Sequence, residues 1–436
     1  MTDEFGVSSP RPHPLRNELA NELHARPSSP VTPPAVVLRL ALVTQEMAAS
    51  ADRNFVEDLC HRFNSAPPGE NSRWHAARLG DVYLRWERHT ELSTLTLHWS
   101  APDDHVRFDS KCPPGWPANW LEGAPGVVLS AVHMEIARGS EPDHDALYEQ
   151  FGEDLSIVGG GPSSSFAATD FKLDADGFCR VAVWSDDEQP AELGRKVQKL
   201  LEIETYRMAA LLSFPVATEA RDQLGEIENE IGLVMSSLVE GERDGEDSAL
   251  LARVSELSAK AEAMAARTSY RFAAGRAYHR IVRERLETFN YPRDAKDGLA
   301  NVQTYEAFLS RRLEPAMRTC DAVETRQQAL IERIARATSL LATRVDVKIG
   351  EQNAELLTSM NTRTEAQLKL QETVEGLSVF AISYYAVGLF GYAIKAIHYA
   401  GVPVDPNIAT GIAVPIVMGV LWLGLKQLKK SLGHSS

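Results

Sequence analysis

The residues of this sequence that could do chemistry are histidines, carboxylates and arginines, and none of them forms an established catalytic or metal-binding motif. The histidines show neither HExxH nor another ligand spacing on one helix, and the four cysteines form no CxxC pair, so neither a zinc site nor a disulfide framework is expected. No GxSxG or comparable nucleophile motif is present. We therefore predict that the protein is not an enzyme and has no resident cofactor.

Three short stretches could be taken for ligand loops. Glu141–Asp145 (EPDHD) gathers three carboxylates and one imidazole; acidic residues at the start of the following helix explain this cluster, and a weak divalent-cation site is the alternative, without a supporting motif. Gly159–Ser165 (GGGPSSS) lacks the Gly-Lys-Ser/Thr ending of a phosphate loop, so we expect a flexible surface loop. Asp174–Gly177 has Lys172 and Val183 where a calcium loop needs its first and last ligands, which predicts a plain hairpin turn.

Arginines form a strong charge pattern in the second half of the chain. Six of them, several four residues apart, would make a basic stripe along one predicted helix. They are Arg267, Arg271, Arg276, Arg280, Arg283 and Arg285. The expected partner is the acidic N-terminal part of the chain, and an anionic lipid surface or another protein is the alternative.

The net charge of −15 is concentrated in the N-terminal part of the chain. Residues 1–188 hold 15 Lys and Arg against 29 Asp and Glu, whereas residues 189–436 hold 30 against 31. An acidic surface disfavours nucleic acid and favours cations or basic partners, although it can also serve solubility alone. We expect no nucleic-acid partner.

The elements that must position these residues fall into a strand-rich part and a helical part, with the change at Pro190. We predict an α+β fold, in which an α/β sandwich head is followed by a long helical stalk and two C-terminal transmembrane helices. The predicted parts are an N-terminal extension (1–34), a cytoplasmic acidic α/β domain (35–188), a helical body with the stalk helix (189–376), a transmembrane hairpin (377–425) and a cytoplasmic basic tail (426–436).

Alternation of apolar and polar residues predicts the strands between Arg73 and Ile136, and a helical period predicts the helices. The expected strands are Val36–Val43, Arg73–Leu79, Val82–His89, Ser93–Trp99, Val127–Ile136, Phe166–Leu173 and Phe178–Trp184. The expected helices are Leu15–Ala25, Gln45–Phe63, Asp143–Asp154, Ala191–Val239 with a bend at Pro215, Ala249–Phe289 and a third long helix from near Leu299, with breaks at Glu240–Ser248 and Asn290–Gly298. The order of the strands does not follow from this pattern.

Two uncharged segments near the C-terminus have membrane length. Leu377–Ile394 and Ile408–Leu425 each have 18 residues, or about 27 Å of helix against a hydrocarbon core of roughly 30 Å. Burial inside a soluble protein is the alternative. Because no N-terminal signal is visible and Lys426, Lys429 and Lys430 follow the second segment, we expect a multi-pass protein in the lipid bilayer with both termini in the cytoplasm.

Three polar residues interrupt the apolar seam of the stalk. Apolar positions between Leu330 and Leu377 recur at steps of three, four or their multiples, and Gln352, Arg363 and Gln367 fall close to the same phase. Polar residues in a seam often set register or oligomeric state, and the alternative is that they line a hydrated interior. Since two spans cannot enclose a pore alone, any transport requires a homo-oligomer.

Two long strings resemble an uncharacterised bacterial family of membrane-anchored proteins, classed as a domain of unknown function. They are HPLRNELANELHARP (His13–Pro27) and LQETVEGLSVFAISYYAVGLFGY (Leu370–Tyr392). The resemblance covers most of the chain and implies a location in the bacterial inner membrane, but it brings no activity with it.

The layout is also similar to that of CorA-type magnesium and cobalt channels. These have a cytoplasmic α/β head, a stalk helix that becomes the first span, and a second span followed by basic residues. The place of their Gly-Met-Asn motif reads Gly391-Tyr-Ala-Ile-Lys395 here, so no selectivity residue carries over. The similarity implies a pentamer and an ion channel or transporter of unknown specificity; the alternative is a membrane-tethered regulatory or scaffolding protein.

Overall fold

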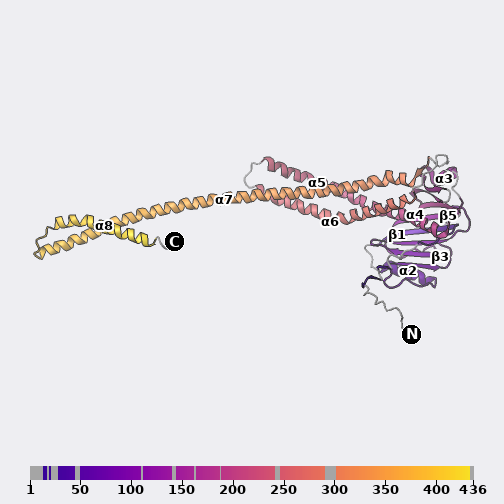
Figure 1. Cartoon of the computed structure of the whole chain (residues 1–436), viewed down its shortest axis with the longest axis horizontal. Helices are drawn as coiled ribbons and strands as arrows, with labels where there is room; N and C mark the ends of the chain where they lie inside the picture. Colours follow the sequence, from indigo (N-terminus) through magenta and orange to yellow (C-terminus); the bar gives the residue numbers. More distant parts are fainter. Residues whose placement is uncertain are drawn as a thin grey trace, which may run out of the picture. The chain divides into compact units, whose positions relative to one another are not determined.

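The computed structural model divides into two compact units (Figure 1). The first holds Met1–Arg243 and Ala252–Thr338, and the second holds Asp244–Leu251 and Ser339–Ser436. The structure describes residues 13–16, 19–20, 28–44, 50–109, 111–139, 144–161, 164–186, 188–240, 246–289 and 301–432. Outside them lie most of the predicted helix Leu15–Ala25, the start of the predicted helix Gln45–Phe63, most of the Glu141–Asp145 cluster, the middle of the Glu240–Ser248 turn, the Asn290–Gly298 break and the end of the basic tail.

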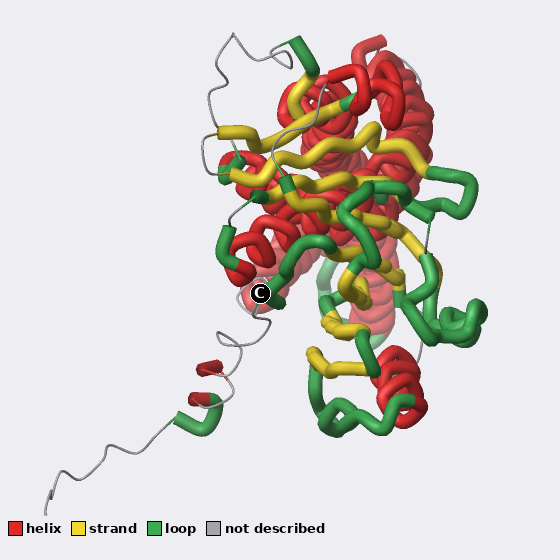
Figure 2. Tube along the Cα trace, turned by 90° about the vertical axis from the view of Figure 1, so that its right-hand side faces the viewer, coloured by secondary structure: helices red, strands yellow, loops and turns green. Residues whose placement is uncertain are grey.

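The described part of the first unit is built on a mixed sheet of nine strands, in the order β2-β3-β4-β1-β5-β8-β7-β6-β9 (Figure 2). The strands are β1 Ala35–Val43, β2 Trp74–Leu79, β3 Val82–Arg88, β4 Leu92–Ser100, β5 Val127–Arg138, β6 Ser156–Gly161, β7 Ser164–Leu173, β8 Cys179–Ser185 and β9 Gln303–Thr304. Neighbours are antiparallel except for β5 with β8 and β6 with β9. The first strand of the chain therefore lies inside the sheet.

β1 occupies this interior position because its residues are apolar on both faces of the sheet, apart from Arg39. On one face Val37 belongs to a core that includes residues of the long helices. On the other face Leu38 belongs to a second core with Trp86 and residues of the helix Ala51–Arg62 (α2). Each fully buried large apolar side chain of this kind stabilises the fold by about 1.5–3 kcal/mol.

The helices are α2 Ala51–Arg62, α3 His144–Phe151, the 3-10 turn η1 Gly152–Asp154, α4 Pro190–Leu211, α5 Ser213–Glu240, α6 Glu246–Glu287, α7 Tyr305–Tyr399 and α8 Pro406–Leu432. The prediction of a mixed α/β head followed by long helices is confirmed. All seven predicted strands are present, with ends shifted by no more than two residues.

The predicted helical stretch Ala191–Val239 with a bend at Pro215 is present as two helices, α4 and α5, which divide at Leu212, three residues before the predicted bend. Gly275 of α6 lies against this division: a Cβ there would come within 2.6 Å of Ser213 Oγ. Pro215 lies in the first turn of α5, where its missing N–H leaves no helical hydrogen bond unmade. The break lies three residues before Pro215, because the proline ring would clash with the Leu211 carbonyl in an uninterrupted helix, and Gly275 lets α6 approach this point closely.

The flexible loop predicted at Gly159–Ser165 is not found in the described part of this stretch, which belongs to β6 and β7, while Pro162 and Ser163 lie outside the described residues. Gly159 pairs with Phe166 across the two strands. Its φ is +84°, and a Cβ would lie 2.2 Å from the Ser165 carbonyl oxygen, so glycine is required for this close pairing. In the described residues, Gly159 thus serves the pairing of β6 with β7.

The expectation that strands end before residue 189 is wrong as well. β9 pairs with β6 through Ser156 and Ile157, and α7 follows it directly at Tyr305 rather than beginning near Leu299, which lies outside the described residues. Two residues show no periodicity, so a strand of this length leaves no pattern to detect.

The second unit contains α8 and the C-terminal part of α7. Both α7 and residues Pro406–Gly424 of α8 are long and apolar enough to cross a membrane. The segments Leu377–Ile394 and Ile408–Leu425 lie within these two helices. Gly391 lies close to α8, since a Cβ there would be 3.4 Å from Thr410 Oγ1. Small residues of this kind let two apolar helices pack closely.

Candidate functional site

The described residues contain no group of three or more His, Cys, Asp or Glu side chains that could hold a metal ion. In the described part of the EPDHD cluster, His144 Nδ1 lies 3.4 Å from Asp145 Oδ1, and both side chains are exposed. Asp174 accepts two backbone N–H groups of its own hairpin, at 2.9 and 3.0 Å, as a turn residue does. Burial raises the pKa of the Cys179 thiol well above its usual value, which disfavours a thiolate nucleophile.

The six arginines of the predicted basic stripe all lie on α6, but they face several different elements. Arg267 donates a hydrogen bond to α5, Arg276 pairs with α7, and Arg285 pairs with α4. Arg280 and Arg283 line a groove between α6 and α7. Three of the six arginines therefore link α6 to other helices of the first unit.

Arg271 is the member of the stripe that reaches the sheet. It forms a two-pronged ion pair with Glu91, which lies between β3 and β4 and is only 2% exposed. Tyr270 also donates to Glu91 at 3.5 Å. The pKa of the neighbouring Tyr278 hydroxyl is raised, mainly by burial and next by its hydrogen bond to Glu91. Glu91 is thus a point where α6 is fastened to the sheet.

Besides this contact, the sheet carries a buried layer of polar side chains that sequence reasoning missed. Arg39 of β1 donates to Thr205 of α4 and to Thr96 of β4, both at 3.2 Å. Arg85 and Glu87 of β3 form an ion pair at 2.7 Å, and both side chains are less than a tenth exposed. Burial opposes ionisation of Glu87, but the two guanidinium groups hold its pKa below its usual value.

The layer continues from β3 into the helices. Arg85 donates to Gln198 at 3.2 Å, Gln198 donates to Glu202 at 2.7 Å, and Glu202 accepts from Arg285 of α6 at 2.6 Å. His98 lies beside it on the wall of a small cavity of about 30 Å³, and burial lowers its pKa to about 4. A single Arg39 inside an apolar strand is the signal that could have revealed this layer.

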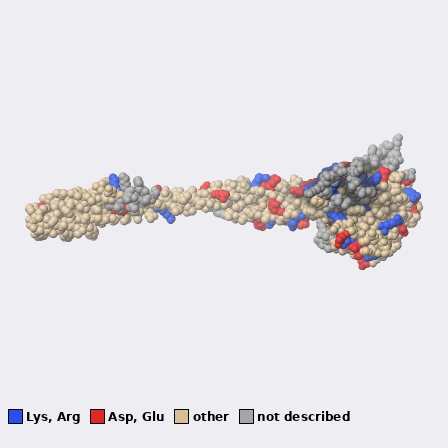
Figure 3. Space-filling model, turned by 60° about the horizontal axis from the view of Figure 1, so that its bottom comes forward, with Lys and Arg blue, Asp and Glu red and all other residues tan. Residues whose placement is uncertain are grey.

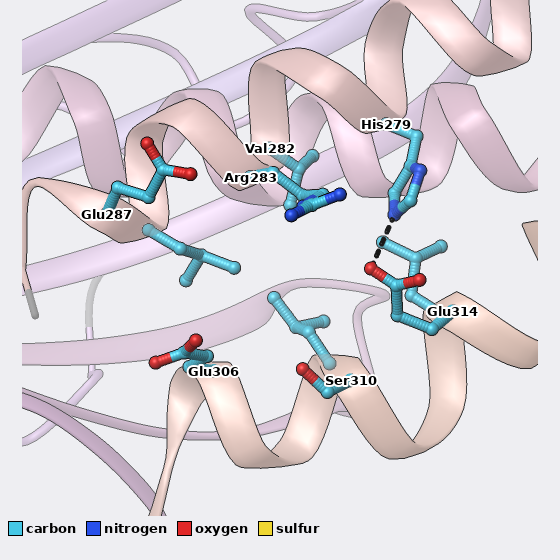
Figure 4. A pocket seen from close by; sticks show the side chains of 10 residues that line it. His279, Val282, Arg283, Glu287, Glu306, Ser310 and Glu314 are labelled. Carbon is cyan, nitrogen blue, oxygen red and sulfur yellow. Dashed lines mark ion pairs between the residues drawn. The ribbon is translucent and has the colours of Figure 1, made fainter.

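A cavity of about 120 Å³ lies between α6 and α7 (Figure 4). His279 Nε2 and Glu314 Oε1 are 3.3 Å apart across it. Arg283 extends into the space between the helices, while Glu306 and Ser310 lie on the α7 wall. Because its lining carries charges of both signs, this cavity suits ion pairing between two helices better than selection of a charged ligand.

The three predicted seam residues, Gln352, Arg363 and Gln367, lie on α7 within the second unit and are all exposed in the single chain. The apolar residues of the same face are exposed too, each by more than half of its surface. They are Leu356, Met360, Leu370, Val374 and Leu377. Upstream, in the first unit, seam residues Leu330 and Ile334 are only 3% and 1% exposed. The described chain therefore covers the seam at one end and leaves it open at the other.

The apolar parts of α7 and α8 are exposed in the same way. Only 6% of the most apolar window of each is buried. In Figure 3 their surface is almost entirely free of charged side chains, in contrast to the mixed charges on the first unit. Ser383 of α7 and Ala413 of α8 are buried. Exposed apolar patches of this kind are typical of surfaces that contact a membrane or another protein.

A family model described as "Protein of unknown function (DUF3422)" matches residues 11–432. No curated protein and no solved structure matches the chain. The chain belongs to the DUF3422 family, which confirms the expectation of an uncharacterised family.

Proposed function

We propose that this member of the DUF3422 family is a homo-oligomeric integral membrane protein that conducts or transports ions, with α7 and α8 as its spans. The observation that carries the proposal is the exposed face of α7 from Leu356 to Leu377, which runs directly into an apolar helix of membrane length. Exposed apolar surface costs roughly 25 cal/mol per Å² in water. Lipid around the spans and further copies around the seam would remove that cost.

The proposed arrangement in the membrane follows from the lysines. Lys426 follows the second span together with Lys429 and Lys430, and basic residues mark the cytoplasmic side. Both termini would then be cytoplasmic in a bacterial inner membrane, and Lys395–Asn407 would form the outer loop. The proposal includes neither an enzymatic activity nor a nucleic-acid partner.

Ion movement is proposed because the seam is not uniformly apolar. Two helices per chain enclose no path, but a ring of copies around α7 would place Gln352, Arg363 and Gln367 near its axis. CorA-type channels have a similar layout of head, stalk helix and two spans, but this chain lacks their selectivity motif. The similarity to these channels suggests a pentamer.

The test combines oligomeric state with flux. The full chain is purified in detergent, its mass is measured by light scattering, and ion flux is followed in liposomes with empty liposomes as the baseline. Leu370→Glu should dissociate the oligomer and abolish flux, because it places a carboxylate in the seam. Lys369→Glu, one residue away on the outward face, should leave both intact. A monomeric wild type without flux would refute the proposal.

A second candidate function is a membrane-tethered scaffold or regulator, favoured by apolar residues exposed on the first unit. Val127 and Val128, at the start of β5, are 73% and 52% exposed. A partner protein docked there would cover them. Affinity capture from native membranes tests this idea: a stoichiometric partner should be recovered with the wild type and lost with Val127→Ser/Val128→Ser. Recovery of no such partner counts against it.

A further inference from the structure

Between Glu351 and Ser378, one face of α7 carries almost no charged residues. Leu356, Met360, Arg363, Gln367, Leu370, Val374 and Leu377 recur at alternating steps of four and three, which makes them the d and a positions of heptads. The remaining charged residues occupy only b, c and f positions. They are Glu351, Glu355, Glu365, Lys369, Glu372 and Glu375.

The positions that flank the seam are uncharged. At e and g, two-stranded coiled coils often carry Glu and Lys that pair between the helices. Here those positions are Gln352, Leu357, Ser359, Thr364, Ala366, Gln371, Thr373 and Ser378. A face of a, d, e and g is four-sevenths of the helix, which is wider than one partner helix covers and favours several copies around an axis.

Arg363 is the exception, since it is the charged residue of this uncharged face. The residues three and four positions before it are Met360 and Ser359, and those three and four after it are Ala366 and Gln367. None is acidic, and Glu365 lies on the opposite side of the helix. Within the described residues Arg363 makes no ion pair or hydrogen bond, and its side chain is exposed.

Assembly would change the surroundings of this guanidinium group. Copies inserted in one membrane hold their spans at the same depth, so their α7 helices are parallel and in register, and every Arg363 lies at one level. A ring of like charges in a packed seam is unfavourable without a counter-charge. Because the carboxylates of each helix face outward, the counter-charge must come from solution.

We infer that the Arg363 ring binds a small inorganic anion on the axis of the oligomer, a site that rests on the proposed function. Gln367, about 6 Å along the helix, adds amide N–H donors to the same axis. Rings of Arg line anion pores, whereas rings of Asp or Glu line cation pores. The species admitted by the proposed path is therefore an anion, and a divalent cation is repelled.

The experiment measures how chloride affects the full-length oligomer in detergent. Sodium chloride is replaced by sodium gluconate at equal ionic strength, and the dissociation temperature of the oligomer is recorded along with the broadening of the ³⁵Cl resonance. The wild type should dissociate several degrees higher in chloride and broaden the resonance. Arg363→Gln should lose both effects, and Arg363→Lys should retain them more weakly. Lys369→Gln, which removes a cation from the outward face, should behave as the wild type does.

Two further outcomes separate this inference from the function on which it rests. Arg363→Leu should give an oligomer of at least wild-type stability that ignores chloride, because an apolar residue needs no counter-ion. An oligomer whose Arg363→Gln variant keeps the full chloride effect, or a wild-type oligomer without any chloride effect, overturns the anion site alone. A monomeric wild type overturns the proposed function together with the site.

Discussion

Arg271 and Glu91 are 180 residues apart in the chain, yet their side chains form a buried ion pair, with Arg271 Nη1 3.2 Å from Glu91 Oε1. The arginine side chain is 14% exposed and the glutamate side chain 2%. This pair fastens the middle of α6 to the turn between β3 and β4. The position of the helices on the sheet therefore depends partly on one charge contact, in addition to the apolar core.

Arg271→Ala should destabilise the first unit by on the order of 3 kcal/mol, because it leaves Glu91 charged and buried. Thermal unfolding followed by tryptophan fluorescence measures the loss. The double variant Arg271→Met/Glu91→Leu should recover much of it, since neither charge then remains. Arg253→Ala removes an exposed pair with Glu230 and serves as the control, for which no measurable change is expected. Equal effects of the two alanine variants would show that burial of the pair is unimportant.

His98 should make the protein less stable in mild acid. Burial lowers its pKa from 6.5 to about 4, so between these pH values the unfolded chain binds a proton at this imidazole and the folded protein does not. Stability therefore falls as the pH falls through this window, by up to about 3 kcal/mol. His98→Gln should flatten the change measured by thermal unfolding between pH 6.5 and 4, whereas His61→Gln, at a side chain 62% exposed, should not. An unchanged slope in His98→Gln would rule out this origin.

Two glycines in helices should respond to alanine in opposite directions. A Cβ at Gly194 of α4 would lie 2.1 Å from the Ser29 carbonyl oxygen, so Gly194→Ala must displace backbone and should cost about 1–3 kcal/mol. A Cβ at Gly225 of α5 meets nothing within 4 Å, so Gly225→Ala should stabilise by about 0.5–1 kcal/mol. Thermal unfolding of both variants checks the pair. A stable Gly194→Ala protein would mean that the segment at Ser29 does not pack on α4 as described.

The contact between α7 and α8 predicts a difference between two neighbouring glycines. Gly391→Leu should force the helices apart at Thr410 and lower the temperature at which helical circular dichroism is lost in detergent. Gly388→Leu faces open space in the single chain and should be tolerated better. If Gly388→Leu instead proves the more damaging change, Gly388 must lie in a contact between copies.

The strands and long helices could be predicted because each leaves a local periodicity in the sequence. The alternation of Ser93–Trp99 and the helical period after Pro190 both correspond to elements of the structure. An element of only one or two residues is too short to show such a pattern. The strand β9 was missed for this reason, since only its pairing to β6 defines it.

The sequence by itself determined the class of the fold, the two apolar helices and the polar interruptions of the seam, because burial periodicity and length are local properties. Only the tertiary structure decided which charges meet, because the partners of Arg271 and Arg85 lie on other elements and no local spacing encodes them. It also decided where the seam is covered. The period is the same at Ile334 and Leu370, yet one is 1% and the other 69% exposed, because packing depends on which elements reach each turn of the helix.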